Sequence, residues 1–302
     1  MATVVLPEAT RALYPFKSHY LTLSDGRRMH YIDEGPEDGE VLVFVHGYLT
    51  WSFIYRAFMI YYAAQGFRCI AMDHIGFGLS DKPTNKRYHT LRRHFANLDE
   101  CITALNLRDV TLVMEDWGAA FGLSYAIQHS QNVKRLVIMN AWAFQDTLVR
   151  QPSRLMSILL KPGVGELMLG SFNLAINYAL QRATLRHLSP SVLTGYRAPF
   201  RDSRNRTALI QFLRMTEIGP GRPSTPLMRR IEQGMQQITT TPTLLVWGKI
   251  DPFYPVDIAR HWKTLMPRVR GPVILDAGHF VPEDAPELLM EHLSHFVEEE
   301  TE

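Results

Sequence analysis

Apolar residues in this chain alternate between two patterns, one typical of buried strands and one typical of helices. Short apolar runs with the length of strands occur at residues 41–45, 69–72, 111–114, 135–139, 243–247 and 273–275. Such runs form strands of a parallel sheet, which is covered on both faces and therefore has no polar side. Between them, apolar residues recur at helical spacing, most clearly at 90–106. The pattern predicts an α/β fold with a mostly parallel sheet flanked by helices.

Two segments depart from this alternation. Residues 20–32 contain two short strand patterns around a Ser-Asp-Gly turn, which predicts a β-hairpin before the first parallel strand. Residues 144–217 contain helical apolar stretches and no strand pattern. We therefore predict a core domain of residues 1–143 and 218–302, with a helical cap domain, 144–217, inserted into it.

The composition argues against several classes of function. The chain has 302 residues, 46% of them hydrophobic, and a net charge of +2, so its charge predicts no nucleic-acid partner. No apolar run is long enough to span a bilayer, and we expect no membrane partner. Cys69 and Cys101 fall in a predicted strand and a predicted helix, so we expect buried thiols and a cytoplasmic location. No side chains have the spacing of metal ligands, and we expect neither a metal nor a cofactor.

A sharp turn between strand 111–114 and the helix after it is the most informative stretch of the chain. Asp116 lies at its apex, and Gly118 and Gly122 follow among other small residues. Small residues are needed at a strained strand-to-helix turn, because the helix backbone must pass close to the strand. Such elbows present a nucleophile, and here the nucleophile is a carboxylate. Glu115 precedes it, and if its side chain faces the site we expect it to raise the pKa of Asp116.

Two further residues follow Asp116 in the chain order of a hydrolytic triad. Asp251 comes after strand 243–247, and His279 comes after strand 273–275. Since the carboxyl ends of parallel strands share one edge of a sheet, we expect both residues to lie near Asp116. Asp116, ionised at neutral pH, would attack a carbon bearing a leaving group and form an alkyl ester. His279, held by Asp251, would then activate the water that hydrolyses this ester.

The backbone N–H groups of Tyr48 and Trp117 are the expected oxyanion hole. Trp117 follows the nucleophile, and Tyr48 follows a His-Gly pair at the end of strand 41–45. Attack of a carboxylate on an acyl carbon would give an anhydride, which argues against an ordinary esterase. Alkyl halides, epoxides and strained lactones are electrophiles that suit this nucleophile better. We expect His46 and Asp73, which lie in the neighbouring loops, to be structural.

Several motifs together resemble the haloalkane dehalogenase family. They are His46-Gly47 with Thr50-Trp51-Ser52-Phe53, the stretch 73–83, Asp116-Trp117-Gly118, the Tyr-Arg-Ala-Pro-Phe stretch 196–200, and Gly278-His279-Phe280. The similarity runs from about Tyr14 to Val297, and the combination is specific, although epoxide hydrolases share Asp-Trp-Gly. It implies an α/β-hydrolase fold with a helical cap, and hydrolysis of a small apolar haloalkane to an alcohol and a halide. One branch of the family has its acid after the sixth strand; Asn140 stands there, which leaves Asp251 as the acid.

The resemblance also implies how a halide is held. In the family the Trp after the nucleophile, here Trp117, donates its indole N–H to the leaving halide, and an Asn after His-Gly usually supplies the second donor. This chain has Tyr48 at that position, so the halide donor on this loop would be a hydroxyl. Trp142 and Tyr178 are further donors that the chain offers near the predicted cap.

Two alternatives remain open. A related Asp-nucleophile hydrolase could open a β-lactone, which needs no halide site and suits Tyr48, or an epoxide, for which Tyr178 and Tyr196 would be the cap tyrosines. A hydrolase fold can also bind a ligand without catalysis, and the intact triad argues against that reading. We expect the partners of this chain to be its substrate, water and a halide product. We expect the chain itself to be a monomer or a homodimer.

Overall fold

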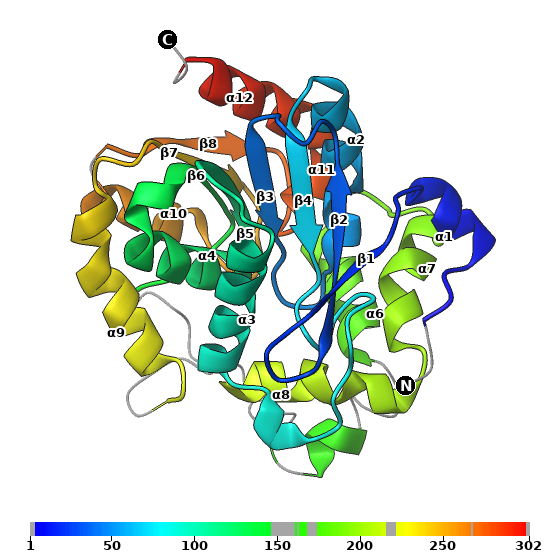
Figure 1. The fold of residues 1–302 in the computed structure, drawn as a ribbon. Coiled ribbons are helices and arrows are strands. Elements are labelled where there is room, and N and C mark those ends of the chain that lie inside the picture. Colours follow the sequence, from blue (N-terminus) through cyan, green and yellow to red (C-terminus); the bar gives the residue numbers. More distant parts are fainter. Residues whose placement is uncertain are drawn as a thin grey trace.

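An eight-stranded sheet forms the centre of the computed structural model of this protein (Figure 1). The structure describes residues 4–145, 161, 163–167, 174–215, 222–266 and 268–299. The strands are β1 (His19–Thr22), β2 (Arg28–Glu34), β3 (Val41–Val45), β4 (Arg68–Met72), β5 (Val110–Glu115), β6 (Val133–Met139), β7 (Thr243–Gly248) and β8 (Arg270–Leu275). Their order is β1-β2-β4-β3-β5-β6-β7-β8. Strands β3 to β8 are parallel, and the predicted hairpin is the antiparallel pair β1 and β2.

Helices cover the sheet on both faces, as predicted. They are α1 (Glu8–Leu13), α2 (Arg56–Ala64), α3 (Leu91–Ala104), α4 (Trp117–Gln128), α6 (Leu174–Ala183), α7 (Pro190–Arg197), α8 (Thr207–Met215), α9 (Thr225–Gly234), α10 (Val256–Leu265), α11 (Val281–Asp284) and α12 (Pro286–Glu299). Helices α2 and α12 pack together, and α3, α4 and α9 form a second packed group (Figure 1). Because both faces are covered, every residue of β5 and of β7 is buried.

The register of the parallel strands aligns their carboxyl ends. Val45, the last residue of β3, pairs with Met72 of β4 and Met114 of β5. Met139, the last residue of β6, pairs with Glu115 of β5, and the loop after β6 begins at Asn140. The loops that follow these strands therefore begin at one edge of the sheet, where α/β folds place their sites.

Helices α6, α7 and α8 lie at the end of the sheet toward which β3 and β4 point (Figure 1). They belong to the segment 144–217, and its described residues are helices, 3-10 turns and loops without a strand. The helical stretches expected at 155–160 lie outside the described residues. The boundaries of the cap domain stay a prediction.

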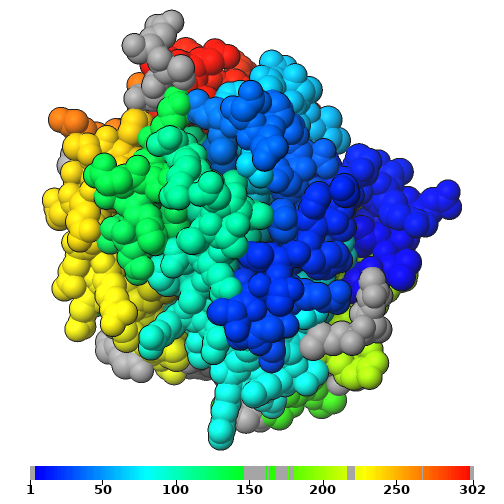
Figure 2. All heavy atoms as spheres, viewed as in Figure 1, coloured from blue at the N-terminus to red at the C-terminus, as the bar shows by residue number. Residues whose placement is uncertain are grey.

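Two elements were not expected from the sequence pattern. Helix α1 lies at the amino end, and helix α10 follows the loop after β7. Strand β8 also begins at Arg270, three residues before the apolar run that predicted it. The space-filling view shows α9, α4, α3 and the amino-terminal hairpin as a continuous surface, yellow through green to blue (Figure 2).

Candidate active site

The turn between β5 and α4 places Asp116 in a strained backbone conformation. Asp116 has φ 50° and ψ −126°, in a region that residues with a side chain rarely adopt. The following helix crosses so near to β3 that a Cβ on Gly118 would lie 2.1 Å from the carbonyl oxygen of Val45. A Cβ on Gly122 would lie 2.2 Å from the sulfur of Met114, which shows how this larger strand residue is accommodated. The small residues of the elbow thus have a steric cause.

The carboxylate of Asp116 is divided between two environments. Its Oδ2 accepts a hydrogen bond of 2.7 Å from the backbone N–H of Tyr48, and the backbone N–H of Trp117 also donates to the carboxylate. Its Oδ1 lies 3.9 Å from Nε2 of His279. The loop that supplies the Tyr48 N–H approaches closely, because a Cβ on Gly47 would lie 2.5 Å from Cβ of Asp116. One carboxylate oxygen therefore sits in the predicted oxyanion hole and the other faces the histidine.

Asp251 holds His279 from the other side. Oδ2 of Asp251 lies 2.8 Å from Nδ1 of His279, so the Nδ1 proton is directed at the carboxylate and Nε2 is directed at Asp116. Oδ1 of Asp251 accepts the backbone N–H groups of Phe253 and Tyr254 at 2.7 and 3.0 Å, which locks the acid in place. The structure thus brings together all three residues of the predicted triad, and each is at most 8% exposed.

Burial and neighbouring charges shift the pKa values of His279 and Asp116. Burial alone would lower the pKa of His279, but the carboxylates of Asp251 and Asp116 outweigh it and raise that pKa to about 9. Burial raises the pKa of Asp116 above its usual value, and the imidazolium of His279 acts in the opposite direction. At neutral pH His279 is therefore an imidazolium, held between the side chains of Asp251 and Asp116.

Glu115, the residue before the nucleophile, is a buried carboxyl group. Its side chain is fully buried, and neither carboxyl oxygen has a hydrogen-bond partner among the described residues. Burial, the largest cause, raises the pKa of Glu115 well above its usual value. The raised pKa of Asp116 comes first from its own burial rather than from a charge on Glu115.

Tyr254 is a site residue that sequence reasoning missed. Its hydroxyl donates a hydrogen bond of 3.0 Å to Oδ1 of Asp116, and its ring centre lies 5.5 Å from that of His279. The available signal was its position in the loop after β7, three residues beyond Asp251. Spacing alone does not show which side chain of such a loop turns inward.

The Tyr48 side chain is held by helix α8. Its hydroxyl donates a hydrogen bond of 3.0 Å to the backbone carbonyl of Leu209 in α8. Its ring stacks on Phe212 of the same helix, with centroids 5.4 Å apart and planes 14° apart. This side chain thus connects the oxyanion loop to α8.

Two tryptophans lie side by side at the nucleophile. The ring centroids of Trp117 and Trp142 are 6.2 Å apart and their planes meet at 74°. The indole nitrogen of Trp142 is buried and has no hydrogen-bond partner among the described residues. Phe121 and Phe212 complete an aromatic wall, with centroids 6.5 and 6.1 Å from that of Trp117. The side chain of Tyr178, another expected donor, is outside the described part of the chain.

His46 and Asp73 have the contacts of structural residues. Asp73 accepts the backbone N–H groups of Ser52 and Leu79 at 2.8 and 2.7 Å. His46 donates from Nδ1 to the carbonyl of Gly47 at 2.8 Å, and burial lowers its pKa to about 4, which keeps the imidazole neutral. These hydrogen bonds hold the two loops that flank the oxyanion hole.

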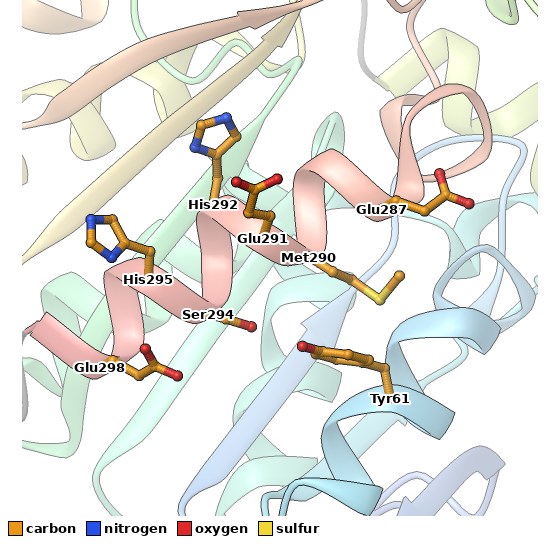
Figure 3. Close-up of a pocket in the computed structure, with 8 residues that line it drawn as sticks. All are labelled: Tyr61, Glu287, Met290, Glu291, His292, Ser294, His295 and Glu298. Atoms are coloured by element: carbon orange, nitrogen blue, oxygen red, sulfur yellow. The ribbon is translucent and has the colours of Figure 1, made fainter.

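Two grooves on the surface of the described residues contain no residue of the predicted triad. One of about 650 Å³ runs along α12 and α2, where Tyr61 of α2 lies beside Met290, and glutamate and histidine side chains of α12 complete its lining (Figure 3). The other lies between α3, α4 and α9.

Within the described residues, no group of three or more His, Cys, Asp or Glu side chains could hold a metal ion. None of the helices in the described part is long and apolar enough to cross a membrane.

Comparison with protein families and known proteins gives a consistent result. The family model for the alpha/beta hydrolase fold matches residues 40–286. The chain is 33% identical over 290 residues to a cis-3-alkyl-4-alkyloxetan-2-one decarboxylase of Shewanella oneidensis, covering 95% of this chain and 90% of that protein. It is 33% identical over 285 residues to a haloalkane dehalogenase of Mycobacterium marinum, covering 91% of this chain and 92% of that protein.

Solved structures agree with the sequence relatives. The haloalkane dehalogenase DbeA of Bradyrhizobium elkani has a TM-score of 0.84 and 26% identity, covering 95% of this chain and 99% of that one. The haloalkane dehalogenase DatA of Agrobacterium tumefaciens has a TM-score of 0.83 and 27% identity, covering 94% of this chain and 97% of that one. Both similarities extend over nearly the full length of each chain.

Proposed function

The chain belongs to the haloalkane dehalogenase family of the α/β-hydrolase superfamily, and from this premise we propose that Asp116 is the nucleophile of a hydrolase that cleaves carbon–halogen bonds. The observation that carries the proposal is that the two oxygens of the Asp116 carboxylate have different partners. Oδ2 accepts a hydrogen bond from the Tyr48 N–H, and Oδ1 faces His279. A carboxylate held in this way presents one oxygen to a substrate carbon and keeps the other ready to become an oxyanion.

In the first step, Oδ1 of Asp116 attacks the carbon that bears the halogen. The carbon–oxygen bond forms as the carbon–halogen bond breaks, and the halide leaves with the bonding electrons. The product is an alkyl ester of Asp116. The aromatic wall of Trp117, Trp142, Phe121 and Phe212 suits a small apolar substrate, because the faces of these rings are apolar.

Two indole N–H groups are the proposed halide donors. Trp117 follows the nucleophile, and Trp142 has a buried N–H without a partner in the described part of the chain. An anion is the partner that satisfies such a buried donor. Tyr48 is not assigned this role, since its hydroxyl is already bonded to Leu209.

In the second step, His279 activates water. The ester removes the negative charge of Asp116, one of the charges that raise the pKa of His279 to about 9. That pKa therefore falls when the ester forms, and the imidazole becomes a base when a base is needed. Water then attacks Cγ of Asp116, and the N–H groups of Tyr48 and Trp117 stabilise the oxyanion on Oδ2.

Trapping the ester tests this proposal. His279→Ala should release about one halide per molecule from a bromoalkane such as 1-bromopropane and then stop, with the propyl group found on Asp116 by peptide mass spectrometry. Asp116→Ala should release none. An inactive wild-type protein across a broad panel of bromo- and chloroalkanes would exclude dehalogenation.

A β-lactone is the second candidate substrate. The Tyr48 side chain leaves the loop without the expected halide donor, and a relative that aligns with 95% of this chain is named an oxetan-2-one decarboxylase. Asp116 would attack the sp³ ring carbon that is bonded to the ring oxygen. The strained ring would open at this bond, which leaves a carboxylate attached to the substrate. Loss of CO2 would then form an alkene and expel the Asp116 carboxylate. Incubation with a cis-3,4-dialkyl-oxetan-2-one and detection of alkene by gas chromatography separates this candidate from dehalogenation.

The state of the two cysteine thiols is the basis for a proposed cellular location. Cys69 and Cys101 are buried and unpaired, and burial raises the pKa of Cys101 to about 12, so both are unreactive thiols. A cytoplasmic location agrees with this state, and fractionation of the native cells tests it.

A further inference from the structure

Tyr254 is held with its hydroxyl on the nucleophile by contacts on both sides of its backbone. Its N–H donates to Oδ1 of Asp251 at 3.0 Å, and its carbonyl accepts the indole N–H of Trp247 at 2.8 Å. Its hydroxyl then reaches Oδ1 of Asp116 at 3.0 Å. The loop that carries the triad acid therefore also aims this hydroxyl at the reacting oxygen.

The two oxygens of Asp116 have different fates, and Tyr254 contacts the oxygen that leaves. Oδ2 stays in the oxyanion hole with the Tyr48 N–H. Oδ1 attacks the substrate and becomes the bridging oxygen of the ester. When water adds to Cγ, the bond between Cγ and Oδ1 breaks, and Oδ1 departs as the oxygen of the alcohol. An alkoxide is a poor leaving group, so its departure requires a proton.

We propose that the Tyr254 hydroxyl is a catalytic residue of the second step, the acid that protonates the departing alcohol oxygen. This inference rests on the proposed function, because it requires an alkyl ester on Asp116. The bond from Cγ to Oδ1 breaks as the phenolic proton moves to Oδ1, which gives the free alcohol and a tyrosinate. The tyrosinate recovers its proton from the imidazolium of His279, which had taken that proton from water. The proton left on the Asp116 carboxyl returns to solvent, matching the acid released with the halide.

The geometry favours Tyr254 over His279 as the direct donor. The distance to Oδ1 is 3.0 Å from the hydroxyl but 3.9 Å from Nε2 of His279, and Nε2 must face the attacking water. Burial and the charge of Asp116 raise the pKa of Tyr254 well above its usual value, so the hydroxyl keeps its proton until it is used. The transfer is favourable, since an alkoxide is a stronger base than a phenolate.

A positioning role would have a different kinetic result. If the hydroxyl only oriented Asp116, its loss would slow the first step, and no ester would accumulate. If it protonates the alcohol, its loss leaves the first step in place and slows the second. The contrast between halide release and alcohol release therefore separates the two roles.

Rapid-quench kinetics of Tyr254→Phe with 1-bromopropane is the direct test. We expect a burst of about one bromide per active site, a propyl ester on Asp116 by mass spectrometry, and alcohol release slowed by about 10²–10⁴-fold. Tyr62→Phe is the matched control, because it removes another buried hydroxyl, which donates to the Met290 carbonyl at 2.9 Å outside the site. It should release bromide and alcohol at the wild-type rates.

Substrates that form more acidic alcohols give a second reading. With 1-bromo-2-fluoroethane, the alkoxide is a better leaving group, so Tyr254→Phe should regain much of its second-step rate, while the wild type should change little. Single-turnover measurements on the wild type alone test this point even if the variant does not fold. A steep dependence of the wild-type second step on alcohol acidity would overturn the inference.

The outcomes also distinguish this inference from the proposed function. If His279→Ala accumulates an ester and Tyr254→Phe does not, the hydroxyl is not the acid and only this inference fails. Wild-type turnover in Tyr254→Phe would overturn it as well. If neither variant forms an ester from any bromoalkane, the proposed dehalogenation fails first.

Discussion

The side-chain amide of Asn140 donates to the backbone carbonyls of both Gly278 and His279, at 2.8 and 2.7 Å. Its Oδ1 accepts the backbone N–H of Gly248 at 2.8 Å. Asn140 thus joins the ends of β6 and β7 to the loop that carries the histidine. A position that could have held a triad acid is instead used to place the triad base.

Asn140→Asp should therefore destabilise the protein instead of supplying a second acid. The carboxylate would replace an NH₂ donor and face two carbonyl oxygens without water, so we expect a loss of order 3 kcal/mol in the free energy of unfolding. Chemical denaturation at pH 7 measures it. Recovery of hydrolysis on adding Asn140→Asp to Asp251→Asn would contradict this view.

Halide binding should depend on Trp142 and not on the Tyr48 hydroxyl. Trp142→Phe removes a buried N–H donor, and we expect bromide to bind about 10–100-fold more weakly, since a hydrogen bond to a charged group contributes roughly 1.5–3 kcal/mol. Tyr48→Phe should bind bromide within about threefold of the wild type, because its hydroxyl donates to Leu209. Quenching of tryptophan fluorescence by added bromide gives both affinities, and the reverse order would reassign the second donor.

The pKa of His279 should fall when Asp116 loses its charge. In the wild type that pKa is raised to about 9, above the ordinary value near ~6.5. The imidazolium therefore contributes stability in full below pH ~6.5, and this contribution disappears as the pH rises through about 9. Asp116→Asn removes one of the supporting charges, so NMR titration of the His279 ring should give a lower pKa. An unchanged value would mean that Asp251 alone sets it.

Glu115→Gln should make the protein less sensitive to high pH. Burial raises the pKa of Glu115 in the folded state, whereas the unfolded chain ionises this group near its ordinary pKa of ~4.3, so the wild type loses stability relative to the variant as the pH rises from there. We expect the Tm of Glu115→Gln to exceed that of the wild type increasingly between pH 5 and pH 8. Parallel pH profiles for the two proteins would show instead that Glu115 is ionised in the fold.

The positions of the triad followed from the sequence because they depend on chain order and sheet topology. A run of apolar residues ending in Asp116, Asp251 or His279 predicts a strand end, and parallel strands bring such ends to one edge. The cap was predicted as helical by its pattern, whereas α10 was missed. Tyr254 could not be singled out, since no periodicity governs which side chain of a loop turns toward the site.

The sequence by itself determined the fold class and predicted the nucleophile and the order of acid and base, because local patterns and topology are sufficient for these. Only the tertiary structure decided where the side chains of Tyr48 and Tyr254 point. The direction of the Tyr48 side chain depends on Leu209 and that of the Tyr254 side chain on Asp116, and both partners come from distant parts of the chain. A side chain points to the hydrogen-bond partner that folding brings within reach, and such partners have no fixed spacing in a sequence.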